Sequence, residues 1–295
     1  MAEPTEANLR AEREQLVTEQ VVASFANTPD ERLRDVMQSL TRHLHAFARE
    51  VRLTSAEWDA AIGFLTRAGH ITDDRRQEFI LLSDVLGLSM LTVGMNAAAD
   101  KEATESTVFG PFFVENSPEI PIGGDMGVGV AGKPCHVAGR VTRTDGTPIA
   151  GARVEVWGAD EDGFYDVQYE GDLTQARAHL FTDDDGNYDF WTVQPAPYPI
   201  PHDGPVGDLL AASRRSVMRP AHIHFMVSAD DCETLITHIF VAGDEWLDKD
   251  AVFGVKESLI VPFEQHEAGD APGRTVDEPW SSAHFDIVLA PATRD

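Results

Sequence analysis

Apolar side chains recur at helical spacing through about the first hundred residues, and this pattern predicts a set of amphipathic helices. One helix is expected to begin at Thr28, an N-cap residue followed by proline at the first helical position. A second is expected to begin at Thr54, because Glu57 completes a capping box three residues later. A third helix is predicted to run from about Thr72 towards Ala98.

From about residue 104 the pattern changes to short alternating runs, separated by turns rich in glycine and proline. Asp185-Gly186 lies between two such runs and predicts a hairpin. The chain is therefore expected to be a mixed α and β protein, with a helical region over residues 1–103 and an antiparallel β-sandwich over residues 104–295. The alternating runs are 135–141, 152–157, 180–181, 188–191, 223–227, 237–241 and 284–289.

Composition narrows the class of protein. The 295 residues include 23 lysines and arginines against 50 aspartates and glutamates, a formal net charge of −27 that makes nucleic acid an improbable partner. No apolar run reaches the roughly 20 residues that cross a bilayer, and the acidic N-terminal segment lacks the apolar core of a secretory signal. Two cysteines, Cys135 and Cys232, exclude a disulfide framework and a thiolate zinc cluster. We expect a soluble, cytoplasmic protein that spans no membrane.

Two histidines supply the first candidate chemistry. His222 and His224 lie in an alternating segment, and side chains at i and i+2 on a strand point to the same side of the sheet. Both imidazoles are therefore able to reach one metal ion. The alternative is a pair of hydrogen-bonded polar residues on a sheet face. A zinc or ferrous site would need a third histidine or a carboxylate, and the many carboxylates of the chain leave that choice open.

Two of the four tyrosines stand in segments that indicate more than packing. Tyr165 follows the predicted strand that ends at Trp157. Tyr198 lies in a loop with four prolines, which fix its backbone at little further entropic cost. The alternative for each is an amphipathic tyrosine that covers the core and keeps its hydroxyl in water.

The ordered set of Tyr165, Tyr198, Arg219, His222 and His224 resembles the intradiol ring-cleaving dioxygenases, and the resemblance covers nearly the whole chain. That family binds ferric iron through two tyrosines and two histidines, so the resemblance implies one non-haem Fe(III) per subunit. Phenolate oxygens offset most of the charge of a trivalent ion, which favours iron over zinc for this donor set. Within the family, the chain is most similar to the hydroxyquinol-cleaving members. The segments that carry this similarity are 81–85, 107–112, 196–201 and 237–240.

The resemblance also implies a role for each of these residues. Tyr165, His222 and His224 are expected to stay bound to iron, while Tyr198 is the ligand that detaches and accepts a proton from the substrate. Arg219 is expected to stabilise charge on the ring carbon under attack. For Arg219 the alternative is a salt bridge at the edge of the sheet.

Further residues are expected to surround the substrate. Asp84 is able to accept a hydrogen bond from a third substrate hydroxyl, and the alternative is a polar residue at a helix turn. His238 stands where catechol-cleaving relatives usually have glutamine, and it is either a partner of the ligands or a core histidine. Apolar walls around a few polar groups are typical of such pockets. The residues expected to bind substrate are Leu81, Asp84, Val108, Phe109, Gly110, Pro111, Phe112, Ile200, Pro201, Arg219, His238 and Val252.

The activity implied by the resemblance is intradiol cleavage of hydroxyquinol (benzene-1,2,4-triol) by dioxygen to 3-hydroxy-cis,cis-muconate, a tautomer of maleylacetate, in aromatic catabolism. The nearest alternative is cleavage of catechol or chlorocatechol. A distant one is a non-catalytic transthyretin-like binding module, which residues 137–156 also resemble. The helical region is expected to form a homodimer interface with an apolar groove for a phospholipid. The residues expected to line this groove are Leu16, Val21, Val22 and Phe25.

Overall fold

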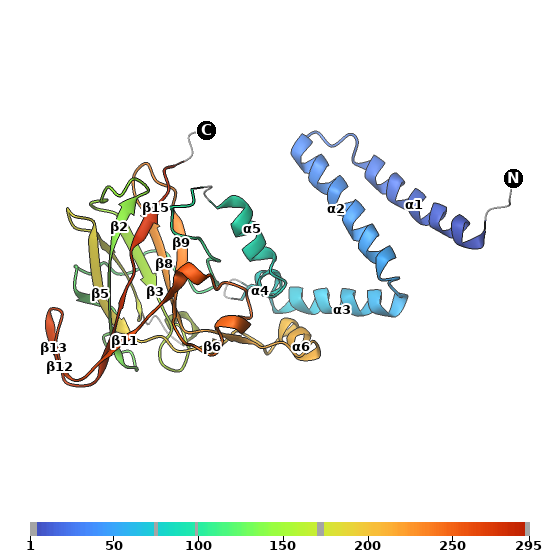
Figure 1. Ribbon diagram of the computed structural model, residues 1–295. Coiled ribbons are helices and arrows are strands. Elements are labelled where there is room, and N and C mark those ends of the chain that lie inside the picture. The colour runs from blue at the N-terminus through green and yellow to red at the C-terminus, as the bar shows by residue number, and fades with distance from the viewer. Residues whose placement is uncertain (1–4, 74–75, 98–99, 170–173, 293–295) are drawn as a thin grey trace. The chain divides into compact units, whose positions relative to one another are not determined.

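The computed structural model describes residues 5–73, 76–97, 100–169 and 174–292 (Figure 1). The chain divides into two compact units, Met1–Thr66 and Arg67–Asp295. This division falls inside a helix and not at the change of pattern, so the predicted boundary between residues 103 and 104 stays a prediction. The helices of the described residues are α1 (Glu6–Ser24), α2 (Glu31–Glu50), α3 (Ser55–Ile71), α4 (Glu78–Val85), α5 (Leu88–Asn96) and α6 (Pro205–Ala212).

The helix starts follow their capping residues, with one correction. The prediction that Thr28 caps α2 is wrong: the Asp30 carboxylate accepts a hydrogen bond from the Leu33 N–H at 2.9 Å. Aspartate caps a helix at least as well as threonine does, and its position directly before Glu31 fits the observed start of α2. The capping box of α3 is confirmed, because the Thr54 N–H donates to Glu57 Oε2 at 2.8 Å and the Glu57 N–H donates to Thr54 Oγ1 at 3.3 Å.

The third predicted helix is two helices. Helix α4 ends at Val85, α5 begins at Leu88, and Gly87 between them has a φ of +74°. A left-handed glycine ends a helix even where the apolar period continues. The predicted end at Ala98 lies outside the described residues. Within those residues no single helix is long and apolar enough to cross a bilayer, whereas α4 and α5 taken together, bent by 78°, meet that test on length and composition.

The second unit contains a β-sandwich (Figure 1). Its strands are β1 (Gly124–Asp125), β2 (Pro134–Arg143), β3 (Arg153–Trp157), β4 (Arg177–Phe181), β5 (Asn187–Val193), β8 (His222–Ser228), β9 (Leu235–Val241), β10 (Ile260–Val261), β11 (Glu264–His266), β14 (Trp280–His284) and β15 (Ile287–Leu289). One sheet has the order β1-β5-β2-β14-β11, with β15 also paired to β2, and the other has the order β10-β9-β8-β3-β4. Both sheets contribute to one apolar core, for example through Phe190 on β5 and Phe225 on β8.

The predicted sandwich with N-terminal helices is confirmed, and its strand pairing is mixed. Strand β8 is antiparallel to β3 and β9, whereas β14 and β15 run parallel to β2. The hairpin predicted at Asp185-Gly186 is wrong, because β4 pairs with β3 while β5 pairs with β2. The turn itself forms, with the Gly186 N–H donating to the Asp183 carbonyl at 3.0 Å. The two strands bury side chains in the same core from opposite sheets, and alternation alone does not distinguish this from pairing.

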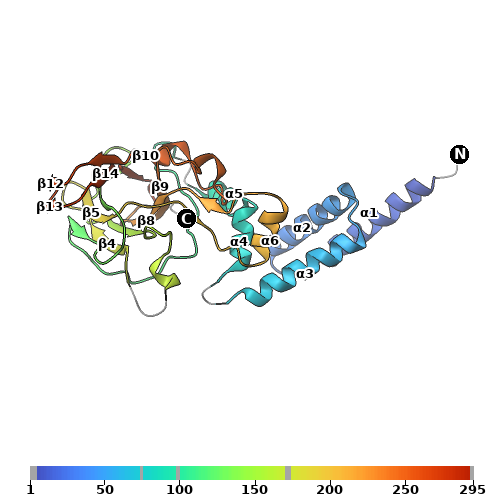
Figure 2. The same ribbon diagram turned by 90° about the horizontal axis from the view of Figure 1, so that it is seen from below.

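Short elements complete the second unit. Helix α6 packs beside α4, where the Val206 N–H donates to the buried Glu78 carboxylate at 2.9 Å (Figure 2). A two-residue pairing between β6 and β7 sets Tyr198 opposite Arg219. The remaining elements are β6 (Tyr198–Pro199), β7 (Met218–Arg219), β12 (Gly269–Ala271), β13 (Arg274–Val276) and the 3-10 turns η1 (Asp166–Gln168), η2 (Leu247–Lys249) and η3 (Glu257–Leu259).

Candidate metal centre

The candidate site lies on the face of the five-stranded sheet that is turned away from the core. Along β8, Ile223 and Phe225 belong to the apolar core, so the alternation turns His222 and His224 to the opposite face. Tyr165 follows β3 as a short connection enters η1. The tyrosine and histidine side chains of the site are all buried, each with at most 4% of its surface exposed.

Four donor atoms from three segments converge beside this face. Tyr165 Oη lies 2.9 Å from His224 Nε2 and 3.5 Å from His222 Nε2. Tyr198 Oη lies 3.1 Å from Tyr165 Oη and 3.3 Å from His222 Nε2, and the two Nε2 atoms are 3.2 Å apart. Atoms bound to one ion at about 2.1 Å in a tetrahedron would lie about 3.4 Å apart. The separations therefore fit donors around a single cation.

The Nδ1 atoms of His222 and His224, which point away from the other donors, are each hydrogen-bonded to a neighbouring group. His222 Nδ1 donates to the Pro220 carbonyl at 2.7 Å. His224 Nδ1 is hydrogen-bonded to His238 Nε2 at 2.7 Å, and His238 Nδ1 to Thr107 Oγ1 at 2.6 Å. Hydrogen bonds of this kind fix the orientation of metal-binding imidazoles and direct the other nitrogen to the ion. The three histidines are also close enough to share a metal, but both nitrogens of His238 are engaged, so the tyrosines are the better remaining donors.

Burial dominates the titration of these side chains. It lowers the pKa of His222, His224 and His238 well below the usual value, so each imidazole is neutral and keeps a lone pair. Burial raises the pKa of Tyr165 well above that of an ordinary phenol, and it raises the pKa of Tyr198 against an opposing effect of the nearby guanidinium. A buried phenolate is stable only beside a positive charge, and a bound trivalent metal ion would provide that charge.

Arg219 is buried against the donors and is not exposed at a sheet edge. Its Nε donates to Asp250 Oδ1 at 3.2 Å and its Nη1 donates to His222 Nε2 at 3.1 Å. Burial lowers the pKa of Arg219, but Asp250 and the neighbouring phenols raise it by more, so the guanidinium stays charged. Its Nη2 is buried and has no hydrogen-bond partner among the residues that the structure describes. One charged donor beside the cluster is therefore left for a ligand.

Aromatic rings enclose the donors. Trp157, opposite His224 in the β3–β8 register, stacks on that imidazole with ring centroids 4.7 Å apart. Phe112 stacks on Tyr165 with centroids 4.4 Å apart, and Phe109 meets Trp157 edge-on at 5.8 Å. These rings exclude water and fix two of the four donor side chains in place.

Two glycines allow the backbone to approach the donors. Gly110 has a φ of +77°, and a Cβ there would lie 3.1 Å from His224 Cε1. Gly163 has a φ of +83°, and a Cβ there would lie 2.3 Å from the Cβ of Tyr198. Glycine is required at both positions by backbone conformation and by space.

The structure brings part of the predicted pocket to this cluster. Phe109, Gly110, Phe112, Arg219 and His238 contact the donors or the rings stacked on them. Asp84 on α4 is buried, and burial raises the pKa of its carboxyl group. A hydrogen bond with Ser89 and the charge of Arg219 both lower that pKa, which shows that the guanidinium is close enough to interact with Asp84 electrostatically. For the remaining predicted residues, a place in the pocket stays a prediction: Leu81, Val108, Pro111, Ile200, Pro201 and Val252.

Three residues of the site escaped the sequence analysis: Trp157, Thr107 and Asp250. The alternation of the strand ending at Trp157 was a usable signal, because its outward face is the face that carries His224. Thr107 lies in segment 107–112, which carries the family resemblance, but nothing in the sequence indicated its contact with His238, and Asp250 gave no signal. Both act through contacts with residues more than thirty positions away, and Asp250 is one of 50 acidic residues.

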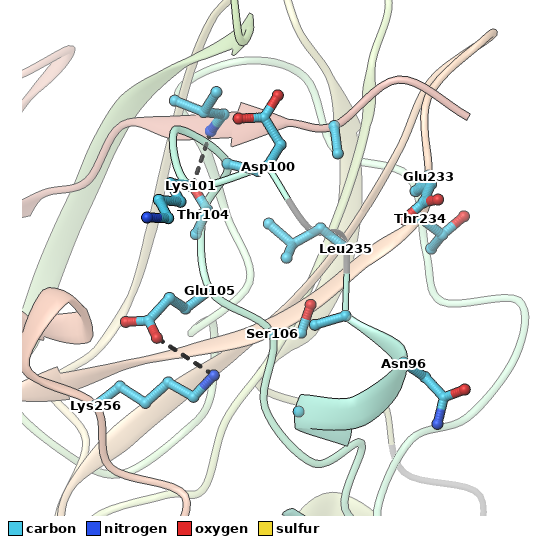
Figure 3. A pocket seen from close by; sticks show the side chains of 15 residues that line it. Asn96, Asp100, Lys101, Thr104, Glu105, Ser106, Glu233, Thr234, Leu235 and Lys256 are labelled. Atoms are coloured by element: carbon cyan, nitrogen blue, oxygen red, sulfur yellow. Dashed lines mark hydrogen bonds and ion pairs between the residues drawn. The ribbon is translucent and has the colours of Figure 1, made fainter. Parts of the chain in front are cut away.

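A cavity of about 550 Å³ lies apart from the donors, and Figure 3 shows its lining. It is bordered by charges of both signs, with Lys256 Nζ 3.5 Å from Glu105 Oε1. None of the predicted site residues lines it.

Comparison with known proteins identifies the class. A family described as "Dioxygenase" matches residues 108–291, and one described as "Catechol dioxygenase N terminus" matches residues 30–104. The two matches together span most of the chain. The chain belongs to the intradiol ring-cleaving dioxygenases, a family that uses non-haem iron.

Individual relatives refine this assignment. Hydroxyquinol 1,2-dioxygenase of Nocardioides simplex is 63% identical over 295 residues, which cover 99% of this chain and 100% of that protein. The solved structure of hydroxyquinol 1,2-dioxygenase from Pseudomonas putida DLL-E4 matches with a TM-score of 0.90 and 43% identity over 96% of this chain and 100% of that one. Catechol 1,2-dioxygenase of Candida albicans is 39% identical over 94% of this chain and 92% of that protein. The predicted similarity to hydroxyquinol-cleaving members is confirmed.

Proposed function

We propose that the protein cleaves hydroxyquinol between its two adjacent hydroxyl-bearing carbons and inserts both atoms of dioxygen, giving 3-hydroxy-cis,cis-muconate, a tautomer of maleylacetate. The observation that carries the proposal is the convergence of two phenol oxygens and two imidazole nitrogens at separations of 2.9–3.5 Å. Identity of 63% to a hydroxyquinol 1,2-dioxygenase against 39% to a catechol 1,2-dioxygenase supports the substrate.

One Fe(III) per subunit is the proposed cofactor, with Tyr165, Tyr198, His222 and His224 as its ligands. The hydrogen bonds at both Nδ1 atoms make Nε2 the donor of each histidine. Two phenolates and two neutral imidazoles would leave the site with a single net positive charge. When bound, the iron supplies Lewis-acid and redox chemistry that draws both adjacent substrate oxygens to it and makes the ring reactive towards dioxygen.

The protein side chains have separate tasks in this proposal. Tyr198 would accept a proton from a substrate hydroxyl on its phenolate oxygen, and Tyr165, His222 and His224 would be the side chains that keep hold of the iron. Trp157 and Phe112 hold His224 and Tyr165 through ring stacking and keep water away from the donors. The buried Nη2 of Arg219 donates a charge-assisted hydrogen bond to the substrate as negative charge develops on it.

Asp84 is the proposed residue that distinguishes hydroxyquinol from catechol. Its carboxyl is buried on α4 and lies within electrostatic reach of Arg219. A hydrogen bond to the third hydroxyl would be lost with catechol, which leaves a buried polar group without its partner. In Asp84→Ala the ratio of kcat/KM for hydroxyquinol to that for catechol should fall about tenfold or more. An unchanged ratio would remove Asp84 from this role.

The decisive experiment is the visible spectrum of the purified protein, recorded before and after hydroxyquinol is added without oxygen. Iron held by tyrosinates gives a broad charge-transfer band, and a shift of that band on addition shows that substrate reaches the metal. Admission of oxygen should then yield the ring-opened product. A protein that stays colourless after reconstitution with iron would contradict the ligand set and favour a non-catalytic binding module.

We also propose that a second copy of the chain covers the apolar surface of the first unit. Single exposed apolar residues are normal on a monomer, but this unit exposes many of them, and an extended apolar surface is typical of an interaction site. A phospholipid in the groove at Leu16, Val21, Val22 and Phe25 is a further proposed occupant, and lipid extraction that finds none by mass spectrometry would exclude it. The large apolar residues exposed in this unit are Leu9, Leu16, Val17, Leu33, Val36, Leu40, Leu44, Phe47, Val51, Leu53, Trp58, Ile62 and Leu65.

The proposed location is the cytoplasm. Cys135 and Cys232 are both free thiols, which suits a reducing compartment. Fractionation of cells that express the protein, followed by an activity assay of each fraction, tests this location.

A further inference from the structure

We infer that Asp250 is a positioning residue for the proposed reaction: its carboxylate orients the Arg219 guanidinium towards the substrate and ties that orientation to the backbone of residues 252–254. The inference rests on the proposed function, because it gives Arg219 a task in the reaction. It adds a residue outside the ligand set and outside the predicted pocket.

The Asp250 carboxylate has three partners. Oδ1 accepts from Arg219 Nε at 3.2 Å and from the Val252 N–H at 3.3 Å, and Oδ2 accepts from the Gly254 N–H at 2.8 Å. The side chains of both members of the ion pair are at least 96% buried, so water does not compete for these contacts. A buried carboxylate with this many donors has one stable orientation, and the guanidinium bonded to it is fixed with it.

The orientation decides which nitrogens face the site. With Nε held by Asp250, Nη1 points to His222 Nε2 at 3.1 Å and Nη2 is left buried without a partner in the described part of the chain. Once a cation takes the lone pair of His222 Nε2, Nη1 loses that acceptor too, and the protein group that remains beside the guanidinium is the phenol oxygen of Tyr198. Buried charged donors without acceptors are costly, which makes this pair a prepared site for substrate oxygen or developing negative charge.

Gly254 lies in close contact with both members of the Arg219–Asp250 ion pair. A Cβ at this position would lie 3.0 Å from Arg219 Nη2 and 3.1 Å from Asp250 Oδ2. Its φ is not in the left-handed region, so alanine is compatible with the backbone there and only the close approach excludes it. The absence of a side chain lets Arg219 Nη2 approach the backbone of the loop closely.

The same loop is attached to the helix that carries Asp84. Arg215 Nη2 donates to the Ala251 carbonyl at 3.2 Å, and its Nη1 donates to the Val85 carbonyl at the end of α4 at 2.5 Å. Asp250 therefore interacts electrostatically with both proposed substrate contacts, Asp84 and Arg219, and Asp84 also interacts with that arginine.

The chain offers a matched control in Asp125. This carboxylate also accepts from a backbone N–H two residues later, that of Gly127 at 2.7 Å, and from the guanidinium of Arg274. Arg274 lies over the ring of Trp191, in the other sheet. The two aspartates thus share a pattern of contacts, one backbone N–H two residues later and one guanidinium, although the Asp125 side chain is 25% exposed and that of Asp250 is 2% exposed. Asp250 alone of the pair is bonded to an arginine at the donor cluster.

The first test is Asp250→Asn in the iron-loaded enzyme, compared with Asp125→Asn. In Asp250→Asn the amide NH2 would face either Arg219 Nε or the Gly254 N–H, because both carboxylate oxygens of Asp250 accept hydrogen bonds, and the guanidinium would lose its charged partner. We therefore expect kcat to fall about 10- to 100-fold. The iron content and the charge-transfer band of the resting enzyme should stay as in the wild type. Asp125→Asn should change kcat by no more than about twofold. Wild-type kcat in Asp250→Asn, with only a lower unfolding midpoint, would reduce Asp250 to a structural role and overturn the inference.

A double-variant cycle shows whether Asp250 acts through Arg219. If it does, Asp250→Asn with Arg219→Gln should be within about twofold of Arg219→Gln alone, because neighbours in one network are not additive. Full additivity of the two losses would contradict the inference. Wild-type turnover in Arg219→Gln would overturn the proposed task of Arg219 itself, whereas a slow Arg219→Gln beside a normal Asp250→Asn overturns only the positioning.

Gly254→Ala serves where Asp250→Asn does not fold, because it keeps every charge and moves the guanidinium by steric contact. We expect the same pattern in weaker form, with kcat lowered several-fold and the resting spectrum unchanged. An alanine variant with wild-type kcat would contradict a requirement for this orientation.

Discussion

The two units of the chain bury apolar side chains to different degrees. In Arg67–Asp295 the two sheets enclose Phe190, Phe225 and Ile239 completely. In Met1–Thr66 the buried residues among those described are Thr18 and Thr41, while Leu44 and Phe47 are each 55% exposed. The sheet unit buries enough apolar surface to be stabilised by its own hydrophobic core. The helical unit gains comparable stabilisation only when another surface covers its apolar side chains. The sheet unit therefore supports buried chemistry within one chain, whereas the helical unit is suited to association.

The largest effect is expected from a change among the donors. Tyr165→Phe removes one phenol oxygen from the cluster, so the iron content, the charge-transfer band and turnover should all be lost. Iron analysis and the visible spectrum measure this. Tyr188→Phe is the matched control, because the Tyr188 hydroxyl is also buried but donates to the Phe285 carbonyl at 2.6 Å. It should retain colour and lower the free energy of unfolding by about 1–3 kcal/mol. Retained iron and activity in Tyr165→Phe would contradict the ligand set.

Leu44→Asp tests the helical unit. Leu44 is one of the exposed apolar residues of this unit, and a carboxylate in its place would have to be desolvated in the proposed interface. The subunits should therefore separate while the iron band per subunit is retained. Sedimentation velocity of the wild type and the variant measures the change in mass. Val128→Asp, at a residue 73% exposed in the sheet unit, should leave the assembly intact. A wild-type protein that is already monomeric would refute the proposed interface.

Gly110→Ala separates backbone strain from contact with a ligand. Gly110 and Gly146 have similar φ values of +77° and +82°, but a Cβ at Gly146 would meet nothing within 4 Å. Both alanine variants should lose about 1–2 kcal/mol of stability through left-handed strain. Gly110→Ala should in addition shift the charge-transfer band, because its methyl group presses on the ring of His224. Identical spectra for the two variants would show that the close approach has no effect on the donors.

The last prediction concerns the closed core, and its effect is confined to alkaline pH. Burial raises the pKa of the Cys135 thiol from 9.0 to about 12, against smaller opposing effects of Ser281 and Lys133. Because the unfolded chain then loses this proton first, the free energy of unfolding should fall between about pH 9 and 12, by at most about 1.4 kcal/mol per unit. Urea unfolding at several pH values measures the slope, and Cys135→Ala should remove this contribution. An equal slope in both proteins would mean that the thiol is open to solvent.

The sequence predicted the features that depend on local order. Alternation located the longer strands of both sheets, β2, β3, β4, β5, β8 and β9, and the capping box located the start of α3. The sequence analysis failed where strand pairing depends on residues far away in the chain. Strands β4 and β5 flank a normal turn but join different sheets. Among the site residues, spacing two apart brought His222 and His224 to one face, while the convergence of Tyr198 with Tyr165 follows from the whole fold. Asp250 is the clearest example, because its proposed role depends on hydrogen bonds to Arg219 and Gly254 that no local sequence pattern indicates.

The sheet order has a consequence for the time course of synthesis. The last strand of the five-stranded sheet, β10, ends at Val261, whereas the other sheet is completed only by β14 and β15, which pair with β2 across about 145 residues of intervening chain. On a ribosome that adds about 5–20 residues per second, every donor residue emerges before the strands that finish the opposite wall of the core. A nascent chain from whose ribosome β10 has emerged, but β14 has not, would carry the metal-binding face on a sheet whose inner side is still partly open. Such a species is suited to capture by chaperones and is prone to aggregate.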